Sequence, residues 1–240
     1  MVASPPPLTE SELLARARDL AGSTLAEVAL GLNRSVPGDL VHAKGWVGQT
    51  LELALGATAG SRDQPDFEQL GVELKTVPVG TGGRPSESTF VCTIPLLDVA
   101  RSEWRESRVH RKLARVLWVP IQADPERPIA ERLVGEPLLW SPSAEQDAAL
   151  KFDWDTLAGL IGSGQIERVT GHLGAVLQVR PKGRNAADRR WGLDEDGVRV
   201  LQLPRGFYLR ARFTEGILRE HYRLPGDTAE PTRLRRRSRR

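Results

Sequence analysis

The chain has 240 residues, of which 40% are hydrophobic and 27% charged, an ordinary composition for a protein with a substantial core. No apolar run approaches the roughly 18 residues that span a bilayer, and the N-terminus lacks the basic and apolar segments of a signal peptide, so we expect a cytoplasmic protein without a membrane segment. The single cysteine, Cys92, excludes an internal disulfide, and the four histidines lack the spacing of a zinc site.

The positive charge is concentrated at the C-terminus. The formal net charge is +3, but residues 233–240 contain six arginines, so residues 1–232 alone have a net charge of −3. We expect residues 224–240 to be a disordered tail, which either attracts phosphates without regard to sequence or only adds solubility. Arginines outnumber lysines by 29 to five, so each lysine is a candidate for a role that needs a compact ammonium group with an adjustable pKa.

Capping-box spacings mark the first two helices, after residues 1–8, which we expect to be flexible. Thr9 stands three residues before Glu12 at the start of the first helix, and Thr24 three residues before Glu27 at the start of the second. Apolar residues with a helical period follow both boxes. The chain is therefore predicted to begin with two consecutive helices.

A third helix is predicted over residues 44–57, "KGWVGQTLELALGA", because apolar residues recur along one face. Glu52 lies off that apolar stripe. A charged residue in this position is usually solvated, but this helix leads directly into the loop that contains Asp66. Glu52 is therefore a candidate third carboxylate of an acidic site.

The stretch "DFEQLGVELKTVPV", residues 66–79, predicts a strand with charged side chains on one face. Side chains two residues apart share a face, so Glu73 and Lys75 lie together while the apolar residues around them point to the core. One interpretation is an ion pair on a solvated edge. The other adds Asp66 from the loop and gives a hard oxygen site of the kind that Mg²⁺ accepts, beside a lysine. Such a trio can orient and activate a water for attack on a phosphodiester.

The centre of the chain predicts further strands. The glycine-rich residues 80–88 and a strand at 89–96 indicate a hairpin with the preceding strand and a long tip. Residues 101–115 contain six basic and two acidic residues and precede a buried strand at 116–121. They form either a solvated helix face or one wall of a phosphate-binding cleft. Residues 126–150 are predicted to be a connecting region.

The last third of the chain predicts a short helix at 153–164, followed by a strand that ends at 180–182. A second strand then leads to a turn at 205–208, and a final helix runs to about residue 222. No internal repeat is evident along the chain.

Eight segments in colinear order, between about residues 10 and 222, resemble the MutH family of bacterial DNA mismatch repair endonucleases. These segments are "KGWVGQTLE", "LGATAGS", "DFEQLGVELKT", "RPSESTFVC", "KLARVLWVP", "PLLWSP", "LQVRPK" and "LPRGFYL". The spacing D-x6-E-x-K is unspecific by itself, because acidic residues are common, but the ordered set is specific. Residues 183–200 and the arginine tail depart from the family pattern.

The resemblance implies an α/β protein of the restriction-endonuclease-like fold, with a mixed central sheet flanked by helices and two lobes around a DNA-binding cleft. Residues 9–223 would form this single domain. It also implies a Mg²⁺-dependent endonuclease that nicks the unmethylated strand of hemimethylated GATC sites, 5′ of the G. Members of the family are activated by MutL after MutS has found a mismatch, so we expect these partners for an enzyme that acts as a monomer.

Transferred residue by residue, the resemblance assigns Asp66 and Glu73 as metal ligands, together with the carbonyl of Leu74. Lys75 would position or deprotonate the attacking water, and both roles stay open. Glu52 matches the additional acidic residue at the family's site.

The DNA contacts of the family fall on seven positions of this chain. These are Lys44, Phe90, Lys112, Arg180, Pro181, Lys182 and Tyr208. The strand end at 180–182 would contact bases, and the aromatic residue at 208 would lie near the adenine, whose N6 methyl changes a major-groove donor. For the two aromatic residues ordinary packing is the alternative.

Three other functions stay open at this point. A restriction endonuclease of the same fold would break both strands at GATC, although one D-x6-E-x-K set in a single short chain favours a nick. A non-catalytic DNA-binding module, or a partner-docking protein that has lost its metal, would leave DNA intact. The arginine tail also allows RNA binding, because basic tails bind either polymer.

Overall fold

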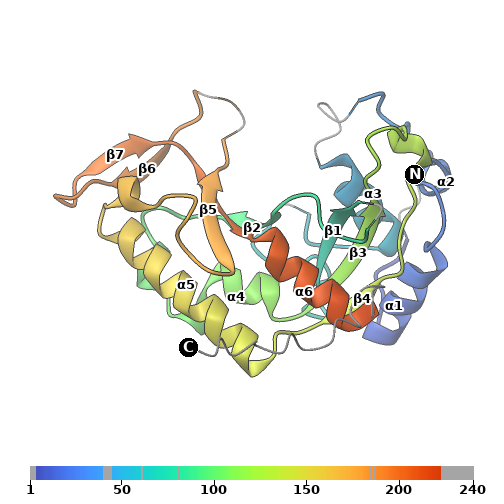
Figure 1. The fold of residues 1–240 in the computed structure, drawn as a ribbon, viewed down its shortest axis with the longest axis horizontal. Helices are drawn as coiled ribbons and strands as arrows, with labels where there is room; N and C mark the ends of the chain where they lie inside the picture. Colours follow the sequence, from blue (N-terminus) through green and yellow to red (C-terminus); the bar gives the residue numbers. More distant parts are fainter. Residues whose placement is uncertain are drawn as a thin grey trace, which may run out of the picture.

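The computed structural model describes residues 4–39, 45–60, 62–80, 82–183, 185 and 187–222. Its α-helices in these ranges are α1 (Glu10–Asp19), α2 (Leu25–Gly31), α3 (Trp46–Leu55), α4 (Arg108–Leu113), α5 (Ala144–Gly162) and α6 (Ala211–Tyr222) (Figure 1). Its strands are β1 (Glu73–Val79), β2 (Thr89–Thr93), β3 (Val116–Gln122), β4 (Leu138–Trp140), β5 (Leu177–Pro181), β6 (Arg190–Leu193), β7 (Arg199–Gln202) and β8 (Arg205–Leu209). Four short 3-10 helices are η1 (Val99–Arg101), η2 (Trp104–Glu106), η3 (Ile129–Glu131) and η4 (Ile166–Arg168).

The first two helices begin where the capping boxes predict them. The Thr9 hydroxyl accepts the backbone N–H of Glu12 at the start of α1. At the start of α2, Thr24 and Glu27 make both reciprocal bonds of a capping box. These bonds satisfy N–H groups that have no partner inside the helix, so the sequence signal has a direct physical cause.

The first sheet is mixed, with strand order β1-β3-β4. β1 and β3 are parallel, and β4 is antiparallel to β3. The face of β3 that carries Leu117 and Val119 packs on α1, α2 and α3, while Val116 and Trp118 on the other face join a second core with α5. Because both faces are covered, β3 is a continuous apolar run.

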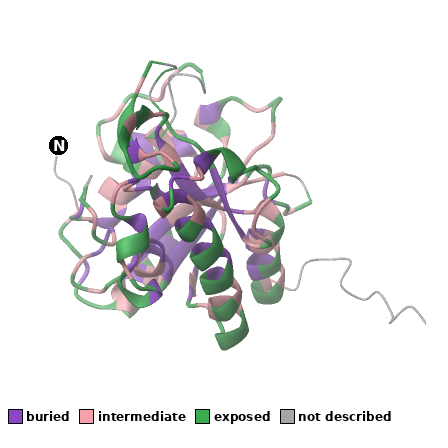
Figure 2. Ribbon diagram, turned by 90° about the vertical axis from the view of Figure 1, so that its left-hand side faces the viewer, coloured by how far each residue is buried: buried purple, intermediate pink, exposed green. Residues whose placement is uncertain are grey.

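The second sheet is antiparallel, with strand order β2-β8-β5. Its inner residues, among them Leu177 and Phe207, pack against Leu157 of α5 and Ile217 of α6. The hairpin of β6 and β7 extends from this half of the molecule, at the upper left of Figure 1. Figure 2 shows the buried residues along the central strands and the exposed residues on the outer faces of the helices.

The predicted fold class is confirmed, since a mixed sheet is flanked by helices in an α/β arrangement. No helix within the described ranges is long and apolar enough to cross a membrane.

The predicted hairpin between residues 66–79 and 89–96 is wrong. β1 pairs with β3, and β2 pairs with β8, while only an isolated bridge, Val79 to Pro85, closes the intervening loop. The apolar residues of β1 next to Glu73 and Lys75 are buried. Pairing with β3 inside the molecule buries these residues more fully than an exposed hairpin would.

Three further predictions need correction. The connecting region 126–150 contains β4 and the start of α5, which Ser143 and Gln146 cap with a capping box. α5 is therefore a helix of 19 residues, longer than the predicted 153–164. The predicted turn at 205–208 is the strand β8, because its backbone pairs with β2 and β5 on either side.

Candidate active site

Asp66 reaches the start of β1 because the loop before the strand folds back on itself. Phe67 bridges to Val72, and Gly71 adopts a positive φ of 66° in the turn between them. Asp66 is 7% exposed, and its Oδ2 accepts the backbone N–H of Leu74 at 2.9 Å. The carboxylate is thus tied to the strand that carries the other predicted catalytic residues.

Glu73 and Lys75 share one face of β1, as the period of the strand predicts. Lys75 Nζ donates to Glu73 Oε1 at 2.7 Å, and it lies 3.4 Å from the carbonyl oxygen of Val91 on β2. Glu73 is 3% exposed. The ion pair is therefore buried between the two sheets and does not lie on a solvated edge.

Lys112 lies against the same carboxylate. Its Nζ donates to Glu73 Oε2 at 2.8 Å and to the carbonyl oxygen of Gln64 at 2.5 Å, and the residue is 9% exposed. Each carboxylate oxygen of Glu73 therefore accepts a hydrogen bond from a lysine ammonium group. The DNA contact assigned to Lys112 stays a prediction, but the structure places its charge at the carboxylates.

The helix that carries Lys112 holds the loop that carries Asp66. Arg108 Nε and Arg111 Nη2 each lie 2.8 Å from Asp63 Oδ2. Sequence reasoning missed this function of the basic segment 101–115. The available signal was the spacing 108, 111 and 112, which places three cations on one face of a helix.

The electrostatics of the carboxylate group favour a cation. Burial, and next the charge of Glu73, raise the pKa of Asp66 to about 7. Burial and Glu73 also raise the pKa of Glu52. Burial opposes the charge of Lys75, but Glu73 and Asp66 outweigh it and raise its pKa, so Lys75 is an ammonium at neutral pH.

A strip of aromatic and basic side chains crosses the second sheet. Phe90 on β2 and Tyr208 on β8 meet edge to face, with ring centroids 5.3 Å apart. The guanidinium carbon of Arg180 lies 5.8 Å from the Tyr208 ring centroid, and Lys182 Nζ lies 4.3 Å from that of Phe90. We call these four residues the aromatic–basic strip. Pro181 ends β5 between the two cations and is exposed, and Lys44 lies outside the described residues.

Gly206 leaves space for the Phe90 ring of this strip, a role that sequence reasoning missed. A Cβ at position 206 would lie 2.9 Å from the Phe90 ring and 3.3 Å from the Cys92 carbonyl oxygen. A side chain here would push the aromatic ring out of place. The segment "RGF" in the family-like sequence "LPRGFYL" was the available signal.

Comparison with known proteins shows which family the chain resembles. The family model described as "DNA mismatch repair enzyme MutH" matches residues 55–153, which include Asp66, Glu73, Lys75 and Lys112. The DNA mismatch repair proteins MutH of Salmonella typhi and Salmonella typhimurium are each 50% identical to this chain over 219 residues. The match covers 91% of this chain and 95% of each relative.

The chain belongs to the MutH family. Its resemblance in sequence to this family is thereby confirmed, and membership makes it a nuclease of DNA mismatch repair. The family model ends at residue 153, before the strand β5, whereas the whole-chain matches extend over most of the sequence.

The acidic residues of this MutH-family chain fit a hard divalent cation. Asp66 and Glu73 offer carboxylate oxygens beside the main chain of Leu74, which is the oxygen-only donor type that Mg²⁺ prefers. Across the described part of the chain, no group of three or more His, Cys, Asp or Glu side chains is arranged to hold a metal. A metal here would therefore need main-chain oxygen and water as well, as Mg²⁺ commonly does.

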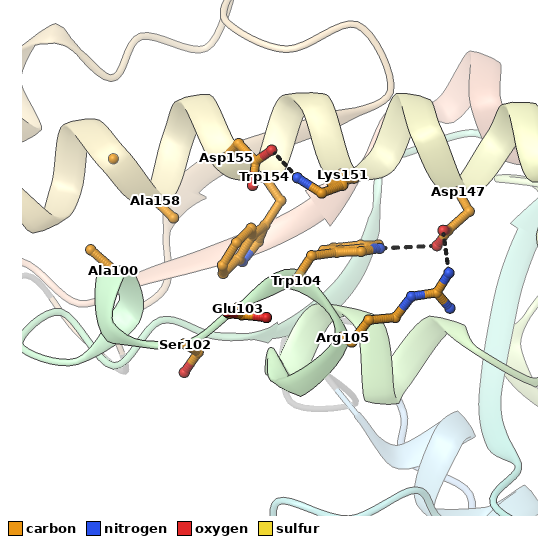
Figure 3. Close-up of a pocket in the computed structure, with 11 residues that line it drawn as sticks. Ala100, Ser102, Glu103, Trp104, Arg105, Asp147, Lys151, Trp154, Asp155 and Ala158 are labelled. Carbon is orange, nitrogen blue, oxygen red and sulfur yellow. Dashed lines mark hydrogen bonds and ion pairs between the residues drawn. The ribbon is translucent and has the colours of Figure 1, made fainter.

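A cavity of about 550 Å³ lies on a different part of this MutH-family chain, between α5 and the segment of η1 and η2. Figure 3 shows Trp104 and Arg105 pointing toward Asp147, which accepts from Trp104 Nε1 at 3.0 Å and lies 3.4 Å from Arg105. Lys151 and Asp155 form a second pair along α5. Both of its cations, Arg105 and Lys151, thus have a carboxylate partner, and none of the predicted site residues lines the cavity.

Proposed function

We propose that this MutH-family enzyme is a Mg²⁺-dependent endonuclease that nicks the unmethylated strand of hemimethylated GATC sites, 5′ of the G. The observation that carries the proposal is the joining of Asp66 to the start of β1, where Glu73 and Lys75 share one face. Two buried carboxylates beside an ammonium suit phosphodiester hydrolysis, and the family membership supplies the DNA context.

Asp66, Glu73 and the carbonyl of Leu74 would hold the metal. A bound Mg²⁺ supplies charge neutralisation at the phosphodiester and lowers the pKa of a coordinated water. In the metal-free protein Glu73 and Asp66 raise the pKa of Lys75, whereas a cation bound to these two carboxylates would lower it again. Lys75 would therefore either orient the attacking water beside the phosphate or deprotonate it. Glu52, half-buried and within the electrostatic reach of Glu73, would add negative charge that favours the metal.

Recognition of GATC would fall to the second sheet. Arg180 and Lys182 offer donors suited to guanine O6 and N7, and the exposed Pro181 lies between them on β5. Burial raises the pKa of Tyr208, so its hydroxyl stays protonated and can donate at neutral pH. Tyr208 would sense the adenine N6 position, where a methyl group adds bulk and changes the donor.

The expected partners are MutL as activator and MutS through it, acting on a monomeric enzyme in the cytoplasm, where the chromosome is. One acidic site in the described chain supports one cut for each binding event. A nick, and not a double-strand break, follows from this unless two copies act together.

A strand-resolved cleavage assay tests the proposal. Three duplexes carry one GATC that is unmethylated, hemimethylated or fully methylated, each incubated with Mg²⁺, with and without MutL and ATP. Cutting of the unmethylated strand only, and no cutting of the fully methylated duplex, is expected. Concerted cleavage of both strands would favour the restriction-endonuclease alternative, and binding without cleavage would favour a DNA-binding module.

A further inference from the structure

A groove of about 610 Å³ lies beside the aromatic–basic strip, between β5, the loop before β2 and the N-terminal end of α6. Its polar lining side chains are Ser88, His172, Gln178, Arg180, Arg210 and Arg212. We call it the arginine groove. None of the described residues that line it is acidic, although Glu87 adjoins Ser88 in the sequence.

Two of its arginines are held in place by main-chain oxygens. Arg210 donates from Nε to the carbonyl of Gly174 at 2.8 Å, and from Nη2 to the carbonyls of Gly171 and Leu173 at 2.9 Å. Arg212 donates from Nε and Nη2 to the carbonyl of Ala175, at 3.3 and 2.9 Å. Neutral carbonyls fix the planes of both guanidinium groups without cancelling their charge.

These bonds leave capacity for an anion. A guanidinium has five N–H donors, and the bonds to carbonyls use three on Arg210 and two on Arg212. α6 begins at Ala211 in the same groove, and the N-terminal end of a helix of 12 residues adds partial positive charge. A pre-oriented arginine pair at a helix start matches the geometry of a phosphate oxygen.

We propose that the arginine groove binds a backbone phosphate of the DNA duplex next to the recognition sequence. The inference rests on the proposed function, and Arg180 connects the two, because it lines the groove and also lies over the Tyr208 ring. A duplex whose bases meet the aromatic–basic strip would carry its sugar–phosphate backbone into the groove. The groove then sets affinity and register, while the strip reads sequence.

The cavity between α5 and η2 differs from the arginine groove, because its cations are paired with carboxylates of the protein. There each cation has an anion as neighbour within the protein, as with Arg105 and Asp147. In the arginine groove Arg210 and Arg212 are bonded to neutral carbonyls, so their positive field remains available to a ligand.

The test compares Arg212→Gln with Arg101→Gln. Arg212 is exposed and bonds one carbonyl, so its loss spares the fold better than loss of Arg210. Arg101 is an exposed arginine on η1 outside the groove and gives the same change in net charge. Binding of fluorescent duplexes with and without hemimethylated GATC is measured by anisotropy over a salt series, with Ca²⁺ replacing Mg²⁺ to prevent cleavage.

Arg212→Gln is expected to weaken binding of both duplexes by the same factor, about three- to tenfold near 0.1 M salt, and to lower the slope of log affinity against log salt by about one. Arg101→Gln should stay close to wild type. An unchanged salt slope, or a loss limited to the GATC duplex, would overturn the inference.

A further arm separates DNA from free phosphate as the source of the anion. Inorganic phosphate is compared with chloride at matched ionic strength, in buffer without Ca²⁺ because calcium phosphate would precipitate, and equal binding of DNA in both is expected. Displacement of DNA by phosphate from the wild type but not from Arg212→Gln would make the groove a site for small anions. If the wild type bound neither duplex, the proposed function itself would fail. If it bound and cut normally while Arg212→Gln matched it, only the groove assignment would fail.

Discussion

The carboxylate site on the mixed sheet and the aromatic–basic strip on the antiparallel sheet differ in how they are built. Asp66 and Glu73 are 7% and 3% exposed and already bonded to backbone or lysine. The strip is half-buried to exposed, and its members touch through rings and cations. The proposed hydrolysis thus falls where the geometry is fixed, and the proposed DNA recognition falls where side chains can adjust to a partner.

The largest effect is expected at the buried carboxylate site. Glu73→Gln should lower the cleavage rate by about 10³-fold or more, the scale of losing a main electrostatic element of an active site. Duplex binding should be retained, because Glu73 is buried and its side chain bonds Lys75 and Lys112, neither of which belongs to the strip. Cleavage rate and anisotropy are measured together on the hemimethylated duplex.

The glutamine variant is preferred to Glu73→Ala for a structural reason. Both substitutions remove the carboxylate charge beside Lys75 and Lys112, but glutamine keeps one amide oxygen that can accept from an ammonium group, whereas alanine keeps neither bond and should cost more, up to about 3–5 kcal/mol in stability. A circular dichroism melt of both variants checks this difference. Near wild-type cleavage by Glu73→Gln would remove Glu73 from the site.

The second prediction concerns the pH dependence of stability. The folded-state pKa of Asp66 is raised from 3.8 to about 7, so the protonated form is favoured on folding, and its ionisation destabilises the fold as pH rises toward 7. Asp66→Asn should therefore stabilise the metal-free protein, by as much as about 4 kcal/mol above pH 7 and by less at pH 5. Urea unfolding at pH 5 and pH 8 measures this. If the gain in unfolding free energy did not depend on pH, the ionisation of Asp66 would not be its cause.

The third prediction concerns the aromatic–basic strip. Tyr208→Ala should change the ratio of cleavage rates on unmethylated and hemimethylated DNA by about 5- to 100-fold, because one base contact is lost. The metal site should remain functional. Trp191→Ala is the matched control, since Trp191 is an aromatic residue on β6 that is 54% exposed. Equal ratios for Tyr208→Ala and wild type would remove Tyr208 from methyl sensing.

The smallest expected effect concerns Lys112, whose ammonium occupies Glu73 Oε2 in the metal-free protein. A divalent cation must share or displace this contact, so Lys112→Met should tighten Ca²⁺ binding to the free protein by about tenfold. Isothermal titration measures the affinity. Lys151→Met, on the exposed face of α5, is the control. Weaker Ca²⁺ binding in Lys112→Met would instead make Lys112 a group that orients Glu73 for the metal.

The local parts of this structure could be predicted from sequence, and the long-range parts could not. Capping bonds join residues three apart, and the shared face of Glu73 and Lys75 follows from the period of a strand, so both were visible. The pairing of Phe90 with Tyr208 joins residues 118 positions apart and leaves no local pattern. The basic run that contains Lys112 resembles a solvated face, because burial of a lysine depends on a carboxylate that tertiary contacts supply.

The pairing of β2 with β8 also sets an order on folding during synthesis. β1, β3 and β4 are complete once residue 140 has been made, so the sheet of the carboxylate site can assemble early. β2 ends at residue 93 and waits for β8, which starts at residue 205. At a translation rate of about 5–20 residues per second, the β2 edge stays without that partner for roughly 6–22 s. A nascent chain of this family member therefore exposes an unpaired strand edge beside an acidic site that is already formed, and chaperone demand should be greatest in that interval.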